Sequence, residues 1–516
     1  MTQQTELTLI LDALDQVISD PLGRHSWRRF GVQAVKNTDP DILRLMRKRI
    51  TNEIDQHGLA GFYRAFFLQH VLGIKNETVN PGKVLEELRP IHVDRVMSFI
   101  NFEWANIVAD ARSSTEFMQM METANIPRLM ALVNTSILKK TSPHSSLPSK
   151  IIKRIAIYTP QLFNHTHPPT KLAFEHARLL QLQGFEIRIF SCQEQSIVDM
   201  REYLSNDGQL QIPSPETIFE NQVTFQSPIE IIRAQVQFSL PLRAQCILYL
   251  MNVFDPDLCF FVGHQSLLLK SLYQRYPLLA LNISSIAPSG DLDLWLSADA
   301  SAKDATQNAE NHAYYHPFRT IQKEELARLD REELGLRSDA VVLITAGTRL
   351  PKEVVGDWAR AMLDICTRFP QVVWLLVGGD GTMSEVLQAA NAANIKSLPY
   401  QSNLKGIYNC CDIYLNPPRL GGGFSVAEAM AEGLPTLAFS DTDGGKKLGR
   451  LAAKNNEDYF AELIQLITDP TARDIKGKQM QEIFHSTINL ENSTPSLLRA
   501  IALTREKFEQ RGTKTS

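Results

Sequence analysis

The sequence predicts an α/β protein with two Rossmann-like domains that follow an all-α domain. The chain has 516 residues, more than the roughly 250–300 that a single hydrophobic core serves, so several domains are expected. From about residue 150 onward, short β-branched runs alternate with stretches of helical period. This alternation is typical of β-α-β units and of parallel sheets. Before that point the apolar residues recur with a helical period and such runs are missing.

The bulk composition excludes several classes of protein. Charged residues make up 21% of the chain and the formal net charge is -4, so there is no global basic field that would attract nucleic acid. The six cysteines lack the C-x-x-C spacing of zinc sites, which predicts reduced thiols. The first residues lack a secretory pattern and no apolar run of 18 residues occurs. We therefore expect a cytoplasmic protein, with peripheral contact to a membrane left open.

The domain boundaries follow from changes in pattern along the chain. A segment rich in proline and serine, residues 141–150, separates the helical part from the first β-rich run. A second cycle of strands and helices begins shortly after residue 318. We predict a helical domain at 1–148, Rossmann-like domains at 149–318 and 319–490, and a terminal helix at 491–516 that crosses back to the first Rossmann-like domain.

The segment 416–435 carries the strongest functional signal. A strand ends, two prolines fix a turn, and three glycines lead into a helix. Glycines allow close approach of the backbone, and the amides and dipole of a helix N-terminus favour an anion such as a diphosphate. Glu428 lies one turn into this helix, where a carboxylate can accept both hydroxyls of a ribose. The alternative is a capping box, in which Glu428 only satisfies a backbone amide near Ser425.

Two further segments follow strands at the edge where doubly wound sheets bind ligands. Arg349 and Lys352 are cations placed to neutralise a leaving diphosphate, although two exposed surface cations would give the same pattern. Gly378 and Gly379 form a tight turn after the strand 372–377. The loop that begins at Leu398 is expected to flank a nucleobase.

These motifs resemble the donor-binding half of glycosyltransferases with the GT-B fold, especially the retaining family 4-like enzymes, glycosyl transferases group 1. The resemblance covers residues 150–515, weakly in the first half and strongly in the second. It implies that Arg349 and Lys352 hold the diphosphate and Glu428 the ribose. The implied donor-binding residues are Gly347, Thr348, Gly378, Gly379, Pro399, Tyr400, Leu404, Gly421, Gly422, Gly423, Phe424 and Ser425.

One departure from the family pattern concerns the donor sugar. The family commonly has two acidic residues in an E-x7-E pattern, and the first of them contacts the sugar. Here that position is Leu420. The donor sugar, and whether the anomeric configuration is retained or inverted, therefore stay open.

The first Rossmann-like domain is expected to present the acceptor. His165 and His167 follow its first strand, and His264 follows the strand 257–262. The resemblance implies a histidine near the reacting sugar at the position of His264, and the alternative for each histidine is a structural hydrogen bond. Asp291 and Asp293 form an Asp-x-Asp triplet. Because GT-B enzymes generally work without a metal ion, no metal site is expected there.

The resulting hypothesis is a metal-independent hexosyltransferase with His264, Arg349, Lys352 and Glu428 as its catalytic residues. A nucleotide-diphosphate sugar is the co-substrate, with a UDP-sugar as our first expectation, and no further cofactor is implied. The acceptor is a glycan, a lipid-linked glycan or a protein. A non-catalytic binding subunit of a transferase complex and a nucleotide-sugar epimerase remain alternatives. A nicotinamide dehydrogenase is not expected, because no G-x-G-x-x-G follows any strand.

Overall fold

A computed structural model of the chain describes most of its C-terminal four-fifths. The described residues are 44, 93–140, 151–163, 167–195, 227–236, 238–282, 286–297, 312–315 and 329–514. The periodic segments near residues 10 and 42, and the aromatic segment 62–71, lie outside them apart from residue 44. The predicted helical domain is therefore seen only in its last part, which is helical.

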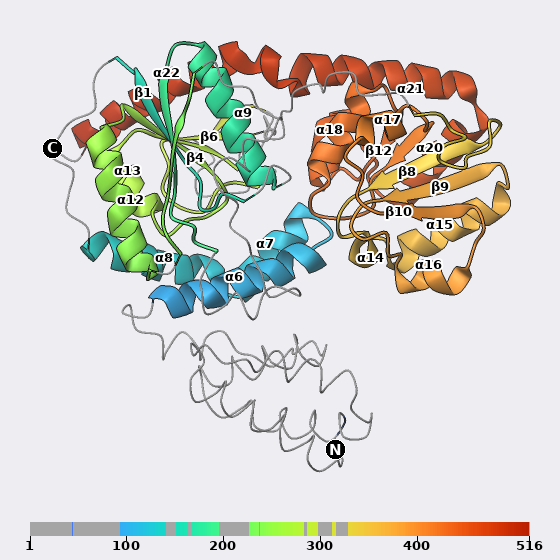
Figure 1. Ribbon diagram of the computed structural model, residues 1–516, viewed down its shortest axis with the longest axis horizontal. Helices are drawn as coiled ribbons and strands as arrows, with labels where there is room; N and C mark the ends of the chain where they lie inside the picture. The colour runs from blue at the N-terminus through green and yellow to red at the C-terminus, as the bar shows by residue number, and fades with distance from the viewer. Residues whose placement is uncertain are drawn as a thin grey trace.

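Two parallel sheets form the framework of the molecule (Figure 1). The first sheet has seven strands: β1 (Arg154–Tyr158), β2 (Glu186–Ser191), β3 (Glu230–Arg233), β4 (Leu258–Val262), β5 (Leu278–Leu281), β6 (Leu294–Ser297) and β7 (His312–Tyr314). The second sheet has five: β8 (Val341–Ala346), β9 (Val372–Val377), β10 (Ile395–Leu398), β11 (Ile413–Leu415) and β12 (Thr436–Leu437). The two predicted Rossmann-like domains are confirmed.

Helices cover both faces of each sheet. Those of the first domain are α9 (Pro168–Leu182), α12 (Leu240–Phe254) and α13 (Leu269–Arg275). Those of the second are α14 (Leu350–Glu353), α15 (Gly356–Arg368), α16 (Glu385–Ala390), α17 (Leu404–Tyr408), α18 (Gly423–Ala431), α19 (Asp443–Leu448), α20 (Asn456–Thr468) and α21 (Pro470–Ile483). The central strands β4 and β9 are buried along their whole length, which is why their sequences read as continuous apolar runs.

The order of the strands decides where a ligand can bind. The sheets run β3-β2-β1-β4-β5-β6-β7 and β10-β9-β8-β11-β12. The chain therefore changes direction across the sheet between β1 and β4 in the first domain, and between β8 and β11 in the second. In open parallel sheets a crevice forms outside the carboxyl ends of the strands at such a switch point. The loops after these four strands carry most of the predicted site residues.

Three helices of the N-terminal part extend the first domain. They are α6 (Val93–Asp110), α7 (Ser114–Thr123) and α8 (Ile126–Lys140). Buried side chains such as Ile100 and Leu129 belong to one apolar cluster with Tyr158 and Phe261 of the first sheet. The core of the first domain thus continues across the linker 141–150. In Figure 1, α6 and α7 lie below the space between the two domains.

The C-terminal helix α22 (Thr494–Lys514) leaves the second domain and packs on the first, against β5 and β6 (Figure 1). Arg511 anchors it there. Its Nε lies 2.9 Å from Asp293 Oδ1 and its Nη2 donates to the carbonyl of Tyr276. Burial raises the pKa of Asp293 to about 6, against the opposing effect of Arg511. The second aspartate of the Asp-x-Asp triplet thus forms an ion pair with the C-terminal helix.

The sequence predicted the long elements and missed several others. The strands 372–377 and 340–346 are found within one residue of their predicted ends. The strands β3 and β10 and the helix α12 were not predicted. In α12 the residues Leu240–Phe254 are apolar on nearly all sides, so the sequence shows little difference between a polar and an apolar face of the helix. In the described part of the chain, the helices are all too short or too polar to cross a membrane.

The anchoring of α22 gives the first prediction. Replacing Arg511 with methionine leaves the buried Asp293 carboxylate without its cation, so we expect a loss of about 2–4 kcal/mol in the free energy of unfolding. Urea unfolding at neutral pH measures the loss. Arg360→Met is the control, because Arg360 and Asp357 form an exposed pair that should contribute less than about 1 kcal/mol. Equal effects of the two substitutions would show that the Asp293 pair is not what holds α22.

Candidate functional site: a cleft between the two sheets

A cavity of about 760 Å³ lies between the two domains, within the range of small-molecule sites. Its walls come from the loops after β1, β4, β8 and β11, and from α6 and α7. The cavity is thus placed at the two switch points, which face one another. Its volume is sufficient for a nucleotide sugar.

Most of the predicted site residues line this cavity. They are His167, His264, Gly347, Thr348, Arg349, Gly378, Tyr400, Leu404, Gly421, Gly422, Gly423, Phe424, Ser425 and Glu428. Lys352, Gly379 and Pro399 do not line it. The backbone carbonyl of Lys352 instead accepts a hydrogen bond from Arg112. His165 lies outside the described residues.

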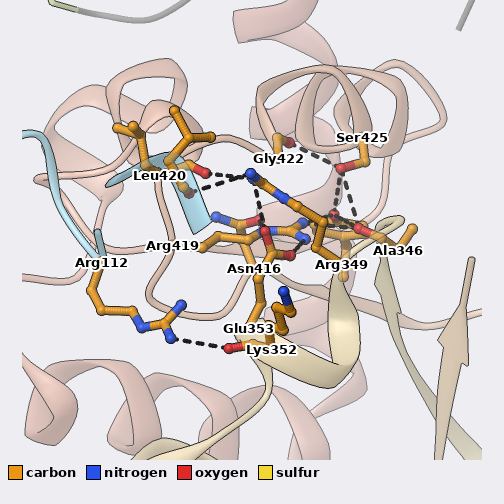
Figure 2. Close-up of polar contacts among 12 residues, drawn as sticks. Arg112, Ala346, Arg349, Lys352, Glu353, Asn416, Arg419, Leu420, Gly422 and Ser425 are labelled. Atoms are coloured by element: carbon orange, nitrogen blue, oxygen red, sulfur yellow. Dashed lines mark hydrogen bonds and ion pairs between the residues drawn. The ribbon is translucent and has the colours of Figure 1, made fainter. Parts of the chain in front are cut away.

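A cluster of the buried Arg419 and Glu353 and the partly exposed Arg349 underlies the glycine-rich loop (Figure 2). Arg419 Nη1 lies 2.6 Å from Glu353 Oε2, and Arg349 Nη2 lies 2.9 Å from Glu353 Oε1. Burial disfavours the Glu353 carboxylate, but Arg419 and Arg349 outweigh it and lower its pKa. The cluster therefore carries one net positive charge. That charge lies beside the cavity, where an anion would be stabilised.

Arg419 was missed in the sequence, although it closely precedes the glycine run. Its guanidinium is almost fully buried and donates to Asn416 Oδ1 and to the carbonyl of Ala346. The glycines make room for it. A Cβ at Gly347 would lie 2.4 Å from Arg419 Nη1, and one at Gly422, where φ is +73°, would lie 2.6 Å from two of its nitrogens. Two predicted donor-binding glycines thus also enclose a structural cation.

The helix α18 begins directly after this loop. Its N-cap is Gly422, and no side chain caps the helix. Ser425 does not form the capping box considered above, because its hydroxyl donates to the carbonyl of Gly422 and accepts from Tyr414. The residues of the first turn lie on the cavity wall. An uncapped helix N-terminus beside a net positive cluster is suited to a diphosphate.

Glu428 joins the second domain to the first. Its Oε1 lies 3.4 Å from the Nζ atom of Lys171, which belongs to α9. Lys171 also approaches Glu175 at 3.9 Å and lies 4.5 Å from the ring centre of Phe424. Burial lowers the pKa of Lys171, but the carboxylates of Glu175 and Glu428 outweigh this effect and raise it. Lys171 is therefore a cavity-lining cation that the sequence analysis did not identify.

His264 is buried at the end of β4. The side-chain amide of Asn282 donates to both His264 Nδ1, at 2.9 Å, and the carbonyl of Ile286. The proton of the neutral ring therefore belongs on Nε2. Burial lowers the pKa of His264 to about 4. In this state His264 can donate a hydrogen bond to a ligand oxygen through Nε2.

His167 serves its own loop. Its ring nitrogens lie 3.0 Å from Gln161 Nε2 and 2.8 Å from Thr170 Oγ1, and burial lowers its pKa to about 3. Because Gln161 of the preceding loop and Thr170 of the first turn of α9 engage both nitrogens, His167 shapes the first-domain side of the cavity as a neutral group.

Leu420 occupies the position of the first acid in the E-x7-E pattern. The side chain belongs to the same apolar cluster as α6, α7 and α8. Its amide donates to the carbonyl of Ala111, and its carbonyl accepts from Arg349 Nη2. Arg349 also donates to the carbonyl of Val108. The loop is thus docked on the N-terminal helices, while Leu420 also borders the cavity.

Glu194 is a third group that the sequence analysis missed, just beyond the end of β2. Its carboxylate accepts from the hydroxyls of Tyr158 and Ser266 and from the amide of Leu267. Burial raises its pKa to about 7. Its backbone carbonyl accepts from Asn101 of α6. Glu194 therefore ties the first sheet to the loop after β4 and to the helical wall of the cavity.

Comparison with known families finds a match within the second domain. Residues 340–469 match the family described as glycosyl transferases group 1. This range contains Arg349, Arg419, the glycine loop and Glu428. The resemblance inferred from the motifs is confirmed for this part of the chain. A search of curated proteins finds no significant match to the sequence.

Solved structures share the fold at low sequence identity. An O-GlcNAc transferase of Thermobaculum terrenum, solved as a mutant, superposes with a TM-score of 0.51 and 13% identity, over 99% of this chain and 100% of the other. The lipopolysaccharide glycosyltransferase WaaG gives 0.41 and 11%, over 68% and 99%. Anabaena HepE, solved with UDP and glucose, gives 0.46 and 12%, over 68% and 100%. The first of these supports the GT-B architecture.

The arginine cluster gives the second prediction. Glu353→Gln leaves the buried Arg419 without its anion, and we expect a loss of about 3–5 kcal/mol in the free energy of unfolding at pH 7. Because the folded pKa of Glu353 is lowered, its stabilisation is present above the ordinary value of 4.5 and is lost as the pH falls through the folded pKa. The difference from the wild type should therefore shrink below pH 4.5.

Urea titrations at several pH values measure this difference. The control is Asp357→Asn, since Asp357 pairs with Arg360 at the exposed surface of the same domain. A Glu353→Gln difference that stays constant down to acidic pH would contradict the assignment of charge within the cluster.

Proposed function

We propose that the chain is a glycosyltransferase that binds a nucleoside-diphosphate sugar in the cleft and transfers its sugar to an acceptor on the first-domain side. The observation that carries the proposal is the juxtaposition of Arg349 with the uncapped N-terminus of α18 at one wall of the cavity. Both features stabilise a diphosphate, and the family match to residues 340–469 supports the same chemistry.

The proposed donor lies against the second domain. Its diphosphate is held by the amides of the glycine loop and by Arg349. Its ribose hydroxyls lie at Glu428, which then exchanges its contact with Lys171 for the ligand. The nucleobase lies against the loop from Tyr400 to Leu404, which lines the same cavity. A UDP-sugar carrying a hexose is our first expectation for the donor.

The reaction breaks the bond between the anomeric carbon and the diphosphate oxygen, which keeps the electron pair. A bond then forms between that carbon and an acceptor oxygen or nitrogen, whose proton is released. Arg349 and the α18 amides stabilise the charge that develops on the leaving diphosphate. His264 donates through Nε2 to an oxygen of a bound sugar. Closure around the substrates excludes water, which would otherwise hydrolyse the donor.

The third prediction tests the anion site. Arg349→Met removes one preorganised donor to the leaving group, so we expect kcat to fall about 10²–10³-fold. Lys352→Met should lose less, because its side chain does not line the cavity. Thermal shifts with UDP, GDP and ADP first identify the nucleotide, and donor turnover is then measured for both variants. Arg360→Met is the exposed-cation control. Absence of stabilisation by any of the three nucleotides would contradict the proposal.

The fourth prediction concerns metal ions. The net positive cluster and the helix N-terminus supply the electrostatic stabilisation that a divalent cation gives in other phosphoryl and glycosyl transfers. We therefore expect turnover to change less than about twofold when EDTA is added. A loss that added Mg²⁺ or Mn²⁺ restores would show that the protein cluster is insufficient.

The fifth prediction is the pH dependence of His264. Because its folded pKa is lowered to about 4, the ring stays neutral well below the ordinary value of 6.5. The stability that this neutral ring contributes is present above pH 6.5 and is lost as the pH falls toward 4. The wild type should therefore lose more stability than His264→Gln between these pH values. Parallel stability curves for the two proteins would contradict the lowered pKa.

A further inference from the structure

We infer that the wall of the cavity formed by α6 and α7 is the acceptor subsite and that it takes a neutral sugar ring. The inference rests on the proposed function and adds to it the class of the acceptor. Met97, Asn101, Trp104 and Val108 of α6 and Phe117 of α7 line this wall. It faces the loops after β1 and β4, which carry Gln161 and Gln265.

An aromatic cluster gives the wall its apolar face. The ring of Trp104 lies 4.9 Å from that of His264, at an angle of 34°. Phe117 packs edge-on against both, at 5.2 Å from Trp104 and 5.7 Å from His264. Phe117 is buried and fixes the arrangement, whereas Trp104 is only half-buried and borders the cavity. The half-buried indole is available to stack against the C–H face of a sugar.

Two amide oxygens give the subsite its polar contacts. Gln161 Oε1 and Gln265 Oε1 are buried, and neither accepts a hydrogen bond from the part of the chain that the structure describes. Gln161 Nε2 is already used, since it contacts His167. A buried carbonyl oxygen without a donor costs free energy, and because both side chains line the cavity, rotation of either amide would bring its oxygen to a ligand. Sugar hydroxyls are such donors, and an aliphatic lipid chain offers none.

The charges of the lining residues favour a neutral ligand. Among the described lining residues the cationic side chains are Lys171, Arg349 and Arg419, and each pairs with Glu428 or Glu353 on the donor side. On the helical wall itself, none of the described lining side chains carries a formal charge. Burial also keeps His264 neutral near pH 7 by lowering its pKa to about 4. An anionic acceptor would therefore meet no opposite charge at this wall.

The contact between Trp104 and His264 connects this subsite to the reaction. A sugar ring stacked on Trp104 lies next to the histidine whose Nε2 can donate. The glycine loop and Arg349 line the same cavity, and Arg349 Nη1 donates to the carbonyl of Val108, one turn of α6 beyond Trp104. The acceptor hydroxyl would thus be presented toward the anomeric carbon of the donor. Trp104 acts here as a substrate-binding residue.

The test uses the full chain saturated with the nucleotide that stabilises it in thermal shifts. Saturation-transfer NMR then measures binding of methyl α-D-glucopyranoside, methyl β-D-galactopyranoside and methyl N-acetyl-β-D-glucosaminide. A short neutral peptide, acetyl-Ser-Ala-amide, is the competing probe. We expect at least one glycoside to bind, and Trp104→Ala to weaken it roughly tenfold. Gln265→Leu, which keeps the volume and removes the amide, should weaken it as well.

Nucleotide binding separates the possible failures. Trp104→Ala and Gln265→Leu should keep the thermal shift with the nucleotide, which shows that both variants fold and that the donor site is intact. The matched control is Tyr249→Ala, because Tyr249 is an exposed aromatic residue of α12 that does not line the cavity. It should leave glycoside binding unchanged.

Three outcomes would contradict the neutral-sugar acceptor subsite and leave the proposed glycosyltransferase function intact. They are nucleotide binding with no glycoside binding, glycoside binding that survives in both cavity variants, and selective binding of the peptide. Absence of any nucleotide binding in the wild type would instead remove the proposed function itself, and the inference with it.

Discussion

The buried ion pair between Arg419 and Glu353 is the constraint on which the candidate site depends. A guanidinium with almost no exposure is tolerated only if its charge and its donors are satisfied, and here Glu353, Asn416 and the carbonyl of Ala346 satisfy them. These partners come from three separate segments of the second domain. The pair therefore fixes the loop after β8, the short helix α14 and the glycine loop relative to one another, and Arg349 shares the same glutamate.

The N-terminal helices α6 and α7 also hold the glycine loop in place. The carbonyls of Val108 and Ala111 bind Arg349 and the amide of Leu420, so the C-terminal end of α6 holds the glycine loop from outside the second domain. The same two helices share a core with the first sheet. One element thus contacts both halves of the cleft, and its aromatic side chains form a wall of the cavity. The position of Leu420 follows from this docking, since an apolar side chain suits a surface that packs against helices.

The sequence predicted the parts of the site that depend on local pattern. The sequence allowed prediction of a glycine run between a strand and a helix, of cations after a strand, and of a histidine at a strand end. Each of these features lies within a few residues of the strand or helix that defines it. The role of Arg419 could not be predicted, because it depends on an ion pair with Glu353, 66 residues away. Lys171 was missed for the same reason, because its partner Glu428 lies 257 residues further along the chain. The helix α12, which is apolar on nearly all sides, and the short strands β3 and β10 lacked the periodicity that made their neighbours predictable.

By itself the sequence determined the two α/β cycles and the glycine-rich loop between a strand and a helix, because hydrophobic period and backbone freedom are local properties. The tertiary structure decided which charged side chains form pairs and that His264 keeps Nε2 for a ligand. It also decided that Lys171 lines the cavity whereas Lys352 does not. It also placed Trp104 and Phe117 beside His264, which is distant from both along the chain. Such pairings depend on how the two sheets and the helical segment pack together. Only this packing determines which side chains are buried and which charges lie close enough to interact.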